Sequence, residues 1–243
     1  MWLKVVMCIT RKLAVALLFT ALSLNTSFAN TTVKKRERGP LKRTELKEAE
    51  RRLSEMGYRT GPVDGVIDTT TRQGLATFQK WEGRRITGNL TRAELNAIRN
   101  ATPPRPRDAG YKHVEVDLDR QVLLLTDDDG AVTTILPVST GSGKRYQEKT
   151  MSGLAYTPRG RFRIYGKIEG WRKSPLGLLY YPNYFSDGLA IHGNPEVPNS
   201  PRSHGCVRIP MWAAKEISEQ LPIGTIVLIY DSQSFVSARE WVQ

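Results

Sequence analysis

The chain has 243 residues and a mass of 27.4 kDa, with 40% hydrophobic and 25% charged residues. This composition supplies apolar side chains for one or two cores, so it excludes a disordered chain and a miniature disulfide scaffold. The formal net charge of +12 favours anionic partners, among which nucleic acid, anionic lipid and bacterial wall polymers all remain possible.

Residues 1–29 are typical of a secretory signal peptide. Basic residues precede a short apolar run, Leu13 to Leu24, and Ser27-Phe28-Ala29 matches a small-x-small cleavage site. The alternative is a membrane anchor, but the apolar run falls short of the roughly 20 residues that cross a bilayer. We therefore expect export across the cytoplasmic membrane to the periplasm or cell wall. Cleavage removes three cations and no acid, which lowers the net charge from +12 to +9 and makes a nucleic-acid partner a poor fit.

The same cleavage removes Cys8, one of the two cysteines, and leaves Cys206 alone. No intramolecular disulfide can then form. A single thiol in an oxidising compartment is either buried as a small hydrophobe or used chemically, so Cys206 is a candidate nucleophile.

Two segments follow the cleavage site. Residues 30–43 form a basic tail, which we expect to be solvated and to contact wall or lipid surfaces weakly at most. Residues 44–100 predict a small three-helix domain, because apolar residues recur at helical spacing and a capping box, Thr91 with Glu94, opens the third helix. The apolar residues that mark these helices are Leu46, Ala49, Leu53, Met56, Leu75, Phe78, Leu95 and Ile98.

A proline-rich linker at 101–110 separates this domain from residues 111–232. In that second region apolar residues recur at every second position, which is typical of β-strands. We expect a hairpin over 122–138, and we place His113 on a solvated strand face with no catalytic role. Further strands are predicted around 162–164 and at 225–230, with one helix at 212–221 and a tail at 233–243. The predicted class is α+β, with the helical domain followed by a mostly β, sandwich-like domain.

Two of the three histidines, His192 and His204, lie close in sequence to Cys206. An imidazole within hydrogen-bond reach can take the proton of a thiol that is otherwise mostly protonated at neutral pH, so this grouping predicts an acyl-transfer nucleophile. Backbone N–H groups beside Gly205 can stabilise an oxyanion. One Cys and two His could also bind zinc, but no further ligand stands at a matching spacing, and we predict no metal.

The helical domain resembles the peptidoglycan-binding domain found on many exported wall enzymes. The resemblance covers about 55 residues and departs from the usual pattern at Asp68, where glycine is common. It implies wall binding. The residues that carry it are Leu53, Gly57, Tyr58, Gly61, Asp64, Gly65, Thr71, Phe78, Gln79, Thr87, Gly88, Thr91 and Leu95.

The second domain resembles the L,D-transpeptidase (YkuD-type) catalytic domain. His192-Gly193 followed by the Ser203-to-Arg208 string SHGCVR carries the resemblance, which extends over about 120 residues. Support comes from Gln121, Leu124, the Val138-to-Gly141 segment and the Thr157-to-Phe162 segment. The interval between Gly193 and Ser203 is shorter than in many relatives.

The resemblance implies roles for individual residues. Cys206 would attack a stem-peptide carbonyl, with His192 as the general base. His204, Gly205 and Ser203 would orient the nucleophile or hold the oxyanion, although the sequence does not separate the two histidines. Arg208, Gly193 and Tyr184 would contact substrate; a structural ion pair is the alternative for Arg208, and packing in the core is the alternative for Tyr184 and its aromatic neighbours.

Together with the signal-peptide pattern, the resemblance implies an exported L,D-transpeptidase that forms a thioester with a peptidoglycan stem peptide, releases D-alanine and transfers the acyl group to an amine. Its partners would be peptidoglycan stem peptides and glycan, with carbapenems as inhibitors, and no cofactor is implied. The alternatives are an L,D-carboxypeptidase or amidase that hydrolyses the same thioester, and a non-catalytic wall-binding protein.

Overall fold

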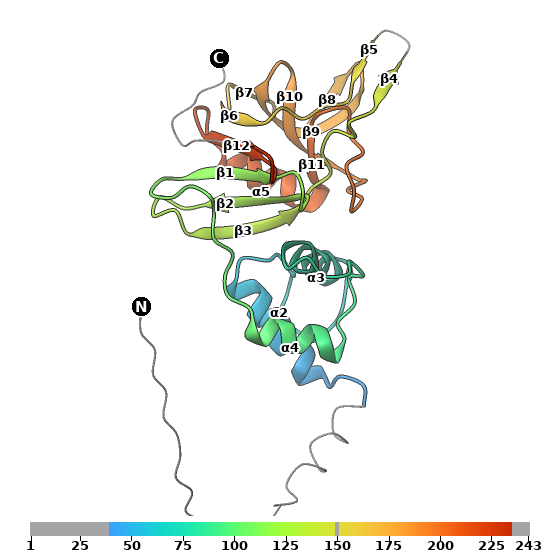
Figure 1. Cartoon of the computed structure of the whole chain (residues 1–243), viewed down its shortest axis with the longest axis vertical. Helices are drawn as coiled ribbons and strands as arrows, with labels where there is room; N and C mark the ends of the chain where they lie inside the picture. Colours follow the sequence, from blue (N-terminus) through green and yellow to red (C-terminus); the bar gives the residue numbers. More distant parts are fainter. Residues whose placement is uncertain (1–38, 149–150, 235–243) are drawn as a thin grey trace, which may run out of the picture. The chain divides into compact units, whose positions relative to one another are not determined.

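The computed structural model describes residues 39–148 and 151–234 (Figure 1). The predicted signal peptide, most of the basic tail and nearly all of the C-terminal tail lie outside the described residues. The described residues from Pro40 to Ser234 belong to one compact unit. Within the described ranges, no helix is both long enough and apolar enough to cross a membrane.

The described N-terminal region is helical, as predicted. Its helices are α2 (Arg43–Glu55), α3 (Thr69–Trp81) and α4 (Arg92–Asn100). Side chains cap two of them: Asp68 accepts from the Thr71 backbone N–H at 2.7 Å, and Thr91 accepts from the Glu94 backbone N–H at 3.1 Å. Asp68 therefore replaces the usual glycine with a residue that stabilises the start of α3.

The remainder is mostly β, which confirms the α+β prediction. In chain order the elements are β1 (His113–Asp117), β2 (Val122–Thr126), β3 (Val132–Pro137), β4 (Arg145–Gln147), β5 (Ser152–Leu154), β6 (Gly160–Arg163), β7 (Gly166–Lys167), β8 (Trp171–Ser174), β9 (Gly177–Ser186), β10 (Leu189–Asn194), β11 (Val207–Pro210), α5 (Met211–Gln220) and β12 (Ile226–Tyr230). The first sheet has the order β3-β2-β1-β12-β6. The second has the order β11-β10-β9-β7, with β8 paired to β9, while β4 and β5 form a separate hairpin.

The main core joins one face of the first sheet to the second sheet and to α5 (Figure 1). Val114 and Val116 of β1, Ile191 of β10 and Ala214 of α5 belong to one cluster of buried apolar side chains. Since alternate residues of a strand point to opposite faces, this core uses only half of the residues of each strand.

The opposite face of the first sheet packs against the helices. Val122, Leu124 and Ile135 share a buried cluster with helical residues such as Leu53 and Phe78. The Ile135 backbone N–H also donates to the Gly57 carbonyl at 2.8 Å. The helices are therefore docked on the sheet by apolar contact and by backbone hydrogen bonding, in addition to their covalent connection through residues 101–112.

The expectation that His113 lies on a solvated face is wrong. His113 is fully buried, with its Nε2 atom 3.1 Å from Glu115 Oε1 and its Nδ1 atom 2.8 Å from the Tyr111 carbonyl. The Glu115 carboxylate also accepts the backbone N–H groups of Arg107 and Asp108, each at 2.9 Å. The residues before β1 thus fold over this face, which is why a period-two pattern here does not indicate exposure to solvent.

Candidate active site

The pairing of β10 with β11 places the predicted catalytic residues on one sheet face. These strands run parallel, with Ile191 beside Val207 and His192 beside Arg208. Ile191 and Val207 point into the main core, so the residues that alternate with them point to the opposite face. His192, Arg208 and Cys206, the residue before Val207, therefore share a face although 14 positions separate His192 from Cys206 in the sequence.

A pocket of about 830 Å³ opens on this face and contains the predicted nucleophile and base. Its polar lining includes His192, Asn194, Ser203, His204, Cys206 and Arg208. Its apolar walls come from the β4–β5 and β8–β9 hairpins and neighbouring segments, including Met151, Leu154, Tyr156, Pro175, Leu176, Leu178 and Tyr184. Several of these apolar side chains are exposed, which leaves room for a ligand to contact them.

A tight turn shapes the chain just before β11. Ser203 Oγ donates to the Cys206 carbonyl at 2.5 Å and accepts from the Gly205 backbone N–H at 3.0 Å. Gly205 has φ +141°, and a Cβ atom there would lie 2.7 Å from the Tyr156 carbonyl oxygen, so no other residue fits without rearrangement. Ser203 thus stabilises the turn that holds Cys206, which fits the orienting role expected for it.

The same turn bears on the expected oxyanion site. The Gly205 N–H is already donated to Ser203, whereas the Cys206 N–H donates to no acceptor among the described residues. Of these two amides, that of Cys206 therefore remains available to a substrate oxygen.

Thr157 is a positioning residue that the sequence did not mark as part of the site. Its hydroxyl donates to the Gly205 carbonyl at 2.7 Å and accepts from the Gly141 backbone N–H at 2.8 Å, and it is buried. It therefore ties the nucleophile turn to the segment after β3. The Thr-Pro-Arg-Gly string had supported the family resemblance, but nothing in its pattern reveals a contact with Gly205.

We expect Thr157→Val to loosen the nucleophile turn. The substitution keeps the side-chain shape but leaves the Gly205 carbonyl and the Gly141 N–H without their partner, which should cost about 1–3 kcal/mol of unfolding free energy and slow the reaction of Cys206. Thr133→Val is the matched control, because the Thr133 hydroxyl also donates to a backbone carbonyl but lies on β3. Urea unfolding and the rate of thiol alkylation provide the two measurements, and equal alkylation rates in both variants would contradict a positioning role.

The Cys206 thiol is protonated at rest in this environment. Burial raises its pKa, while a hydrogen bond from the Ala190 backbone and the charge of Arg208 act in the opposite direction and only partly offset that effect. A thiol of this kind is a weak nucleophile until a base removes its proton.

His192 has the protonation state that a base requires. It is 2% exposed, and burial lowers its pKa to about 4, with Gly193 opposing and Arg208 reinforcing this shift. Its Nδ1 atom lies 2.9 Å from the Gly193 carbonyl, which can only accept, so Nδ1 carries the proton and Nε2 has a free lone pair. The imidazole is therefore neutral, and can accept a proton, throughout the physiological range.

His204 is held differently from His192. Its ring packs edge-on against Tyr146 of β4 with a centroid separation of 4.6 Å, and its Nε2 atom is 3.7 Å from Glu148 Oε1. These contacts connect the nucleophile turn to the β4–β5 hairpin. They favour an orienting role for His204.

Arg208 faces the pocket and is half-buried, yet it forms no ion pair with a carboxylate in the described part of the chain. Of its two expected roles, the structural ion pair therefore lacks a partner among these residues. The guanidinium group remains available for a ligand carboxylate.

The two remaining predicted contacts lie in different places. Tyr184 lines the pocket, whereas its neighbour Phe185 belongs to the core. Gly193 is not in the pocket lining: it points toward α5, where an added Cβ would lie 2.6 Å from Ala214 Cβ. The structure thus gives Gly193 a packing role and an acceptor role toward His192, and its substrate contact stays a prediction.

Comparison with known proteins follows the division of this chain into helical and β regions. The profile of the L,D-transpeptidase catalytic domain matches residues 111–229, and that of a peptidoglycan binding domain matches residues 42–98. A crystal structure of an L,D-transpeptidase from Xylanimonas cellulosilytica is 38% identical in sequence, with a TM-score of 0.70, and the match covers 79% of this chain and 94% of that one. The chain belongs to the L,D-transpeptidase family. The mostly β region corresponds to the catalytic profile, and the helical region corresponds to the peptidoglycan binding profile.

More distant L,D-transpeptidases also match. One from Stackebrandtia nassauensis is 24% identical with a TM-score of 0.46, covering 76% of this chain and 90% of that chain. Another, solved in complex with imipenem, is 17% identical with a TM-score of 0.39, covering 49% of this chain and 58% of that chain. No curated protein sequence matches the chain.

Proposed function

We propose that this protein is an exported L,D-transpeptidase that uses Cys206 to form a thioester with a peptidoglycan stem peptide. The observation that carries the proposal is the position of Cys206, His192 and Arg208 on one sheet face, inside one pocket. A nucleophile, a neutral base and a cation that has no carboxylate partner in the described ranges are the three groups that acyl transfer from a carboxylate-bearing peptide requires.

Acylation begins with proton transfer from the Cys206 thiol to His192 Nε2 as the sulfur attacks the carbonyl carbon of the residue before the terminal D-alanine. The oxygen of the tetrahedral intermediate accepts from the Cys206 N–H. When the intermediate collapses, the C–N bond breaks and D-alanine leaves, its nitrogen taking the proton from His192. The enzyme now carries a thioester.

Deacylation repeats these steps with a second amine. The amine attacks the thioester carbonyl and gives a proton to His192, the C–S bond breaks, and the proton returns to the sulfur. One amide bond has been exchanged for another, so the overall reaction needs no cofactor and no external energy source. Arg208 binds a carboxylate of the stem peptide, and the apolar walls hold its aliphatic parts.

The proposal extends to location. The substrate polymer lies outside the cytoplasmic membrane, and residues 1–29 have the composition of a signal peptide. The helical region, which matches a peptidoglycan binding domain, holds the enzyme on the wall while the catalytic region acts.

Incubation of residues 30–243 with purified disaccharide tetrapeptides tests the reaction, with mass spectrometry of the products. We expect a cross-linked dimer that has lost one D-alanine, and no dimer with Cys206→Ala. Disaccharide tripeptide as the sole product would instead identify a hydrolase that transfers the acyl group to water. No product from a well-folded protein would contradict both enzymatic functions.

A further inference from the structure

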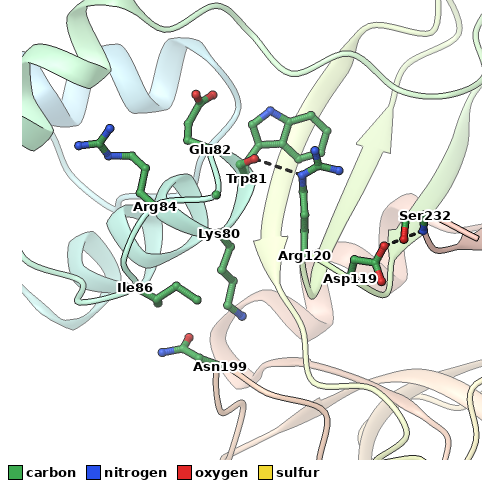
Figure 2. Close-up of a pocket in the computed structure, with 10 residues that line it drawn as sticks. Lys80, Trp81, Glu82, Arg84, Ile86, Asp119, Arg120, Asn199 and Ser232 are labelled. Atoms are coloured by element: carbon green, nitrogen blue, oxygen red, sulfur yellow. Dashed lines mark hydrogen bonds between the residues drawn. The ribbon is translucent and has the colours of Figure 1, made fainter.

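A second pocket lies where the end of α3 and the loop after it face the first sheet (Figure 2). Its volume is about 760 Å³, and it shares no lining residue with the pocket that contains Cys206. From the helical region it is lined by Lys80, Trp81, Glu82, Gly83, Arg84 and Ile86, and from the catalytic region by Asp119, Arg120, Asn199 and Ser232.

Lys80 is a buried cation in this pocket. It is 4% exposed, and its Nζ donates to the Gln121 carbonyl at 3.2 Å. That carbonyl also accepts from the Val138 N–H at 3.0 Å, and no carboxylate forms an ion pair with Lys80 in the described part of the chain. An ammonium group has three N–H donors, so two of them have no acceptor among the residues that the structure describes. Burial of a charge in this state is costly unless a partner arrives.

The other two cations of the pocket already have carboxylate partners. Arg84 pairs with Glu94 at 3.0 Å, and Arg120 pairs with Asp117 at 2.8 Å while its guanidinium group lies over the Trp81 ring. Among the described residues that line the pocket, Lys80 is thus the cation that a ligand anion can neutralise. Figure 2 shows its side chain extending from α3 into the space on the side of Asn199.

We propose that this pocket is a second peptidoglycan site, in which the Lys80 ammonium group binds a carboxylate of a stem peptide. The class of ligand rests on the proposed function. The rest of the lining fits a peptide that carries both carboxylates and amines. The carboxylates of Glu82 and Asp119 can accept hydrogen bonds from an amine of the peptide, and Ile86 offers an apolar contact. Asn199 belongs to the loop that leads to Ser203, so a stem bound here contacts both the helical region and the approach to the nucleophile turn.

The site has a characteristic pH dependence. Burial lowers the pKa of Lys80 to about 8. A bound carboxylate stabilises the ammonium form, so binding is strongest below pH 8 and weakens as pH rises through it. At pH 9 roughly a tenth of unliganded Lys80 is charged, so we expect the Kd to rise about tenfold between pH 6.5 and pH 9.

Methyl NMR can observe the two pockets separately in one titration. The probe is a stem tetrapeptide with free carboxylates, added to the Cys206→Ala variant of residues 30–243 so that no turnover occurs. The Ile86 methyl signal reports on the second pocket, and the Leu178 methyl signals report on the pocket around residue 206. We expect the peptide to cause saturable shifts of the Ile86 signal, and we expect Lys80→Met to abolish them. Lys215→Met, which changes an exposed lysine on α5, should leave these ligand-induced shifts as they are in the protein with Lys215 intact.

Failure of this proposal can be distinguished from failure of the proposed function. Shifts of Leu178 without shifts of Ile86 would overturn the second site and leave the enzyme assignment intact. Equal binding of the same peptide with its carboxylates amidated, or of inorganic phosphate, would also overturn it. If Lys80→Met does not fold, the pH titration of the protein with Lys80 intact decides the matter, because a Kd that is unchanged from pH 6.5 to pH 9 contradicts carboxylate binding by Lys80.

Discussion

Imipenem should add one covalent equivalent to residues 30–243, and Cys206→Ala should abolish the adduct completely. Cys206 is the sole cysteine in this part of the sequence. Attack of its sulfur on the strained lactam carbonyl breaks the ring C–N bond and leaves a thioester, which intact-protein mass spectrometry detects directly.

Two controls make this result interpretable. A thermal melt of Cys206→Ala checks that the variant is folded, and the Thr133→Val variant should acylate like the unmodified protein because its side chain lies outside the pocket. An adduct that survives Cys206→Ala would show that another group is the nucleophile and would remove the basis of the proposed mechanism.

The two histidines should respond differently to substitution and to pH. His192→Gln removes the base, so acylation at pH 7 should fall by about 10²–10⁴-fold while the protein remains folded. In the unmodified enzyme this base is lost only as pH falls through about 4, where His192 becomes protonated. Alkaline pH should partly rescue His192→Gln, because the thiolate then forms without help; the rescue should begin above the ordinary thiol range, since burial raises the Cys206 pKa.

His204→Gln should show the opposite pattern. Loss of the imidazole removes the ring contact with Tyr146, so the variant should be less stable and its nucleophile turn should be distorted. Alkaline pH should restore little of its acylation rate. The measurements are rates of imipenem acylation and iodoacetamide alkylation against pH, with thermal melts. Alkaline rescue of the His204 variant but not of the His192 variant would reverse the two roles and leave the enzyme class unchanged.

Much of the fold could be predicted because local patterns determined it. Apolar residues at helical spacing within one segment, such as Leu75 with Phe78, and the cap at Thr91 depend only on near neighbours in the sequence, and the structure has a helix in each of the three predicted segments. The environment of His113 could not be predicted in this way. Polar and apolar residues alternate along its strand, as they do in a strand with one face in solvent. The polar face is nevertheless buried, because the irregular loop before the strand and segments distant in sequence cover it.

The site was predictable to the extent that its chemistry lies in a short string of residues. The string SHGCVR places Cys206 next to Gly205 and two positions before Arg208. The presence of His192 14 positions before Cys206 suggested a base. The sequence could not indicate that Thr157 reaches the Gly205 carbonyl, that Gly193 faces α5, or that the Gly205 N–H is occupied by Ser203. Each of these depends on the register of β10 with β11 or on loop geometry, which sequence periodicity does not encode.

The docking of the helices on the first sheet limits how this architecture can be recombined. A binding domain is replaced most easily during evolution when a linker is its only connection to the catalytic domain, since neither domain then has to change its surface. Here Val122, Leu124 and Ile135 form part of the same buried cluster as the helices. A new module could replace the present one only with compensating substitutions in β2 and β3, because an unaltered sheet would expose a strip of aliphatic side chains and favour aggregation.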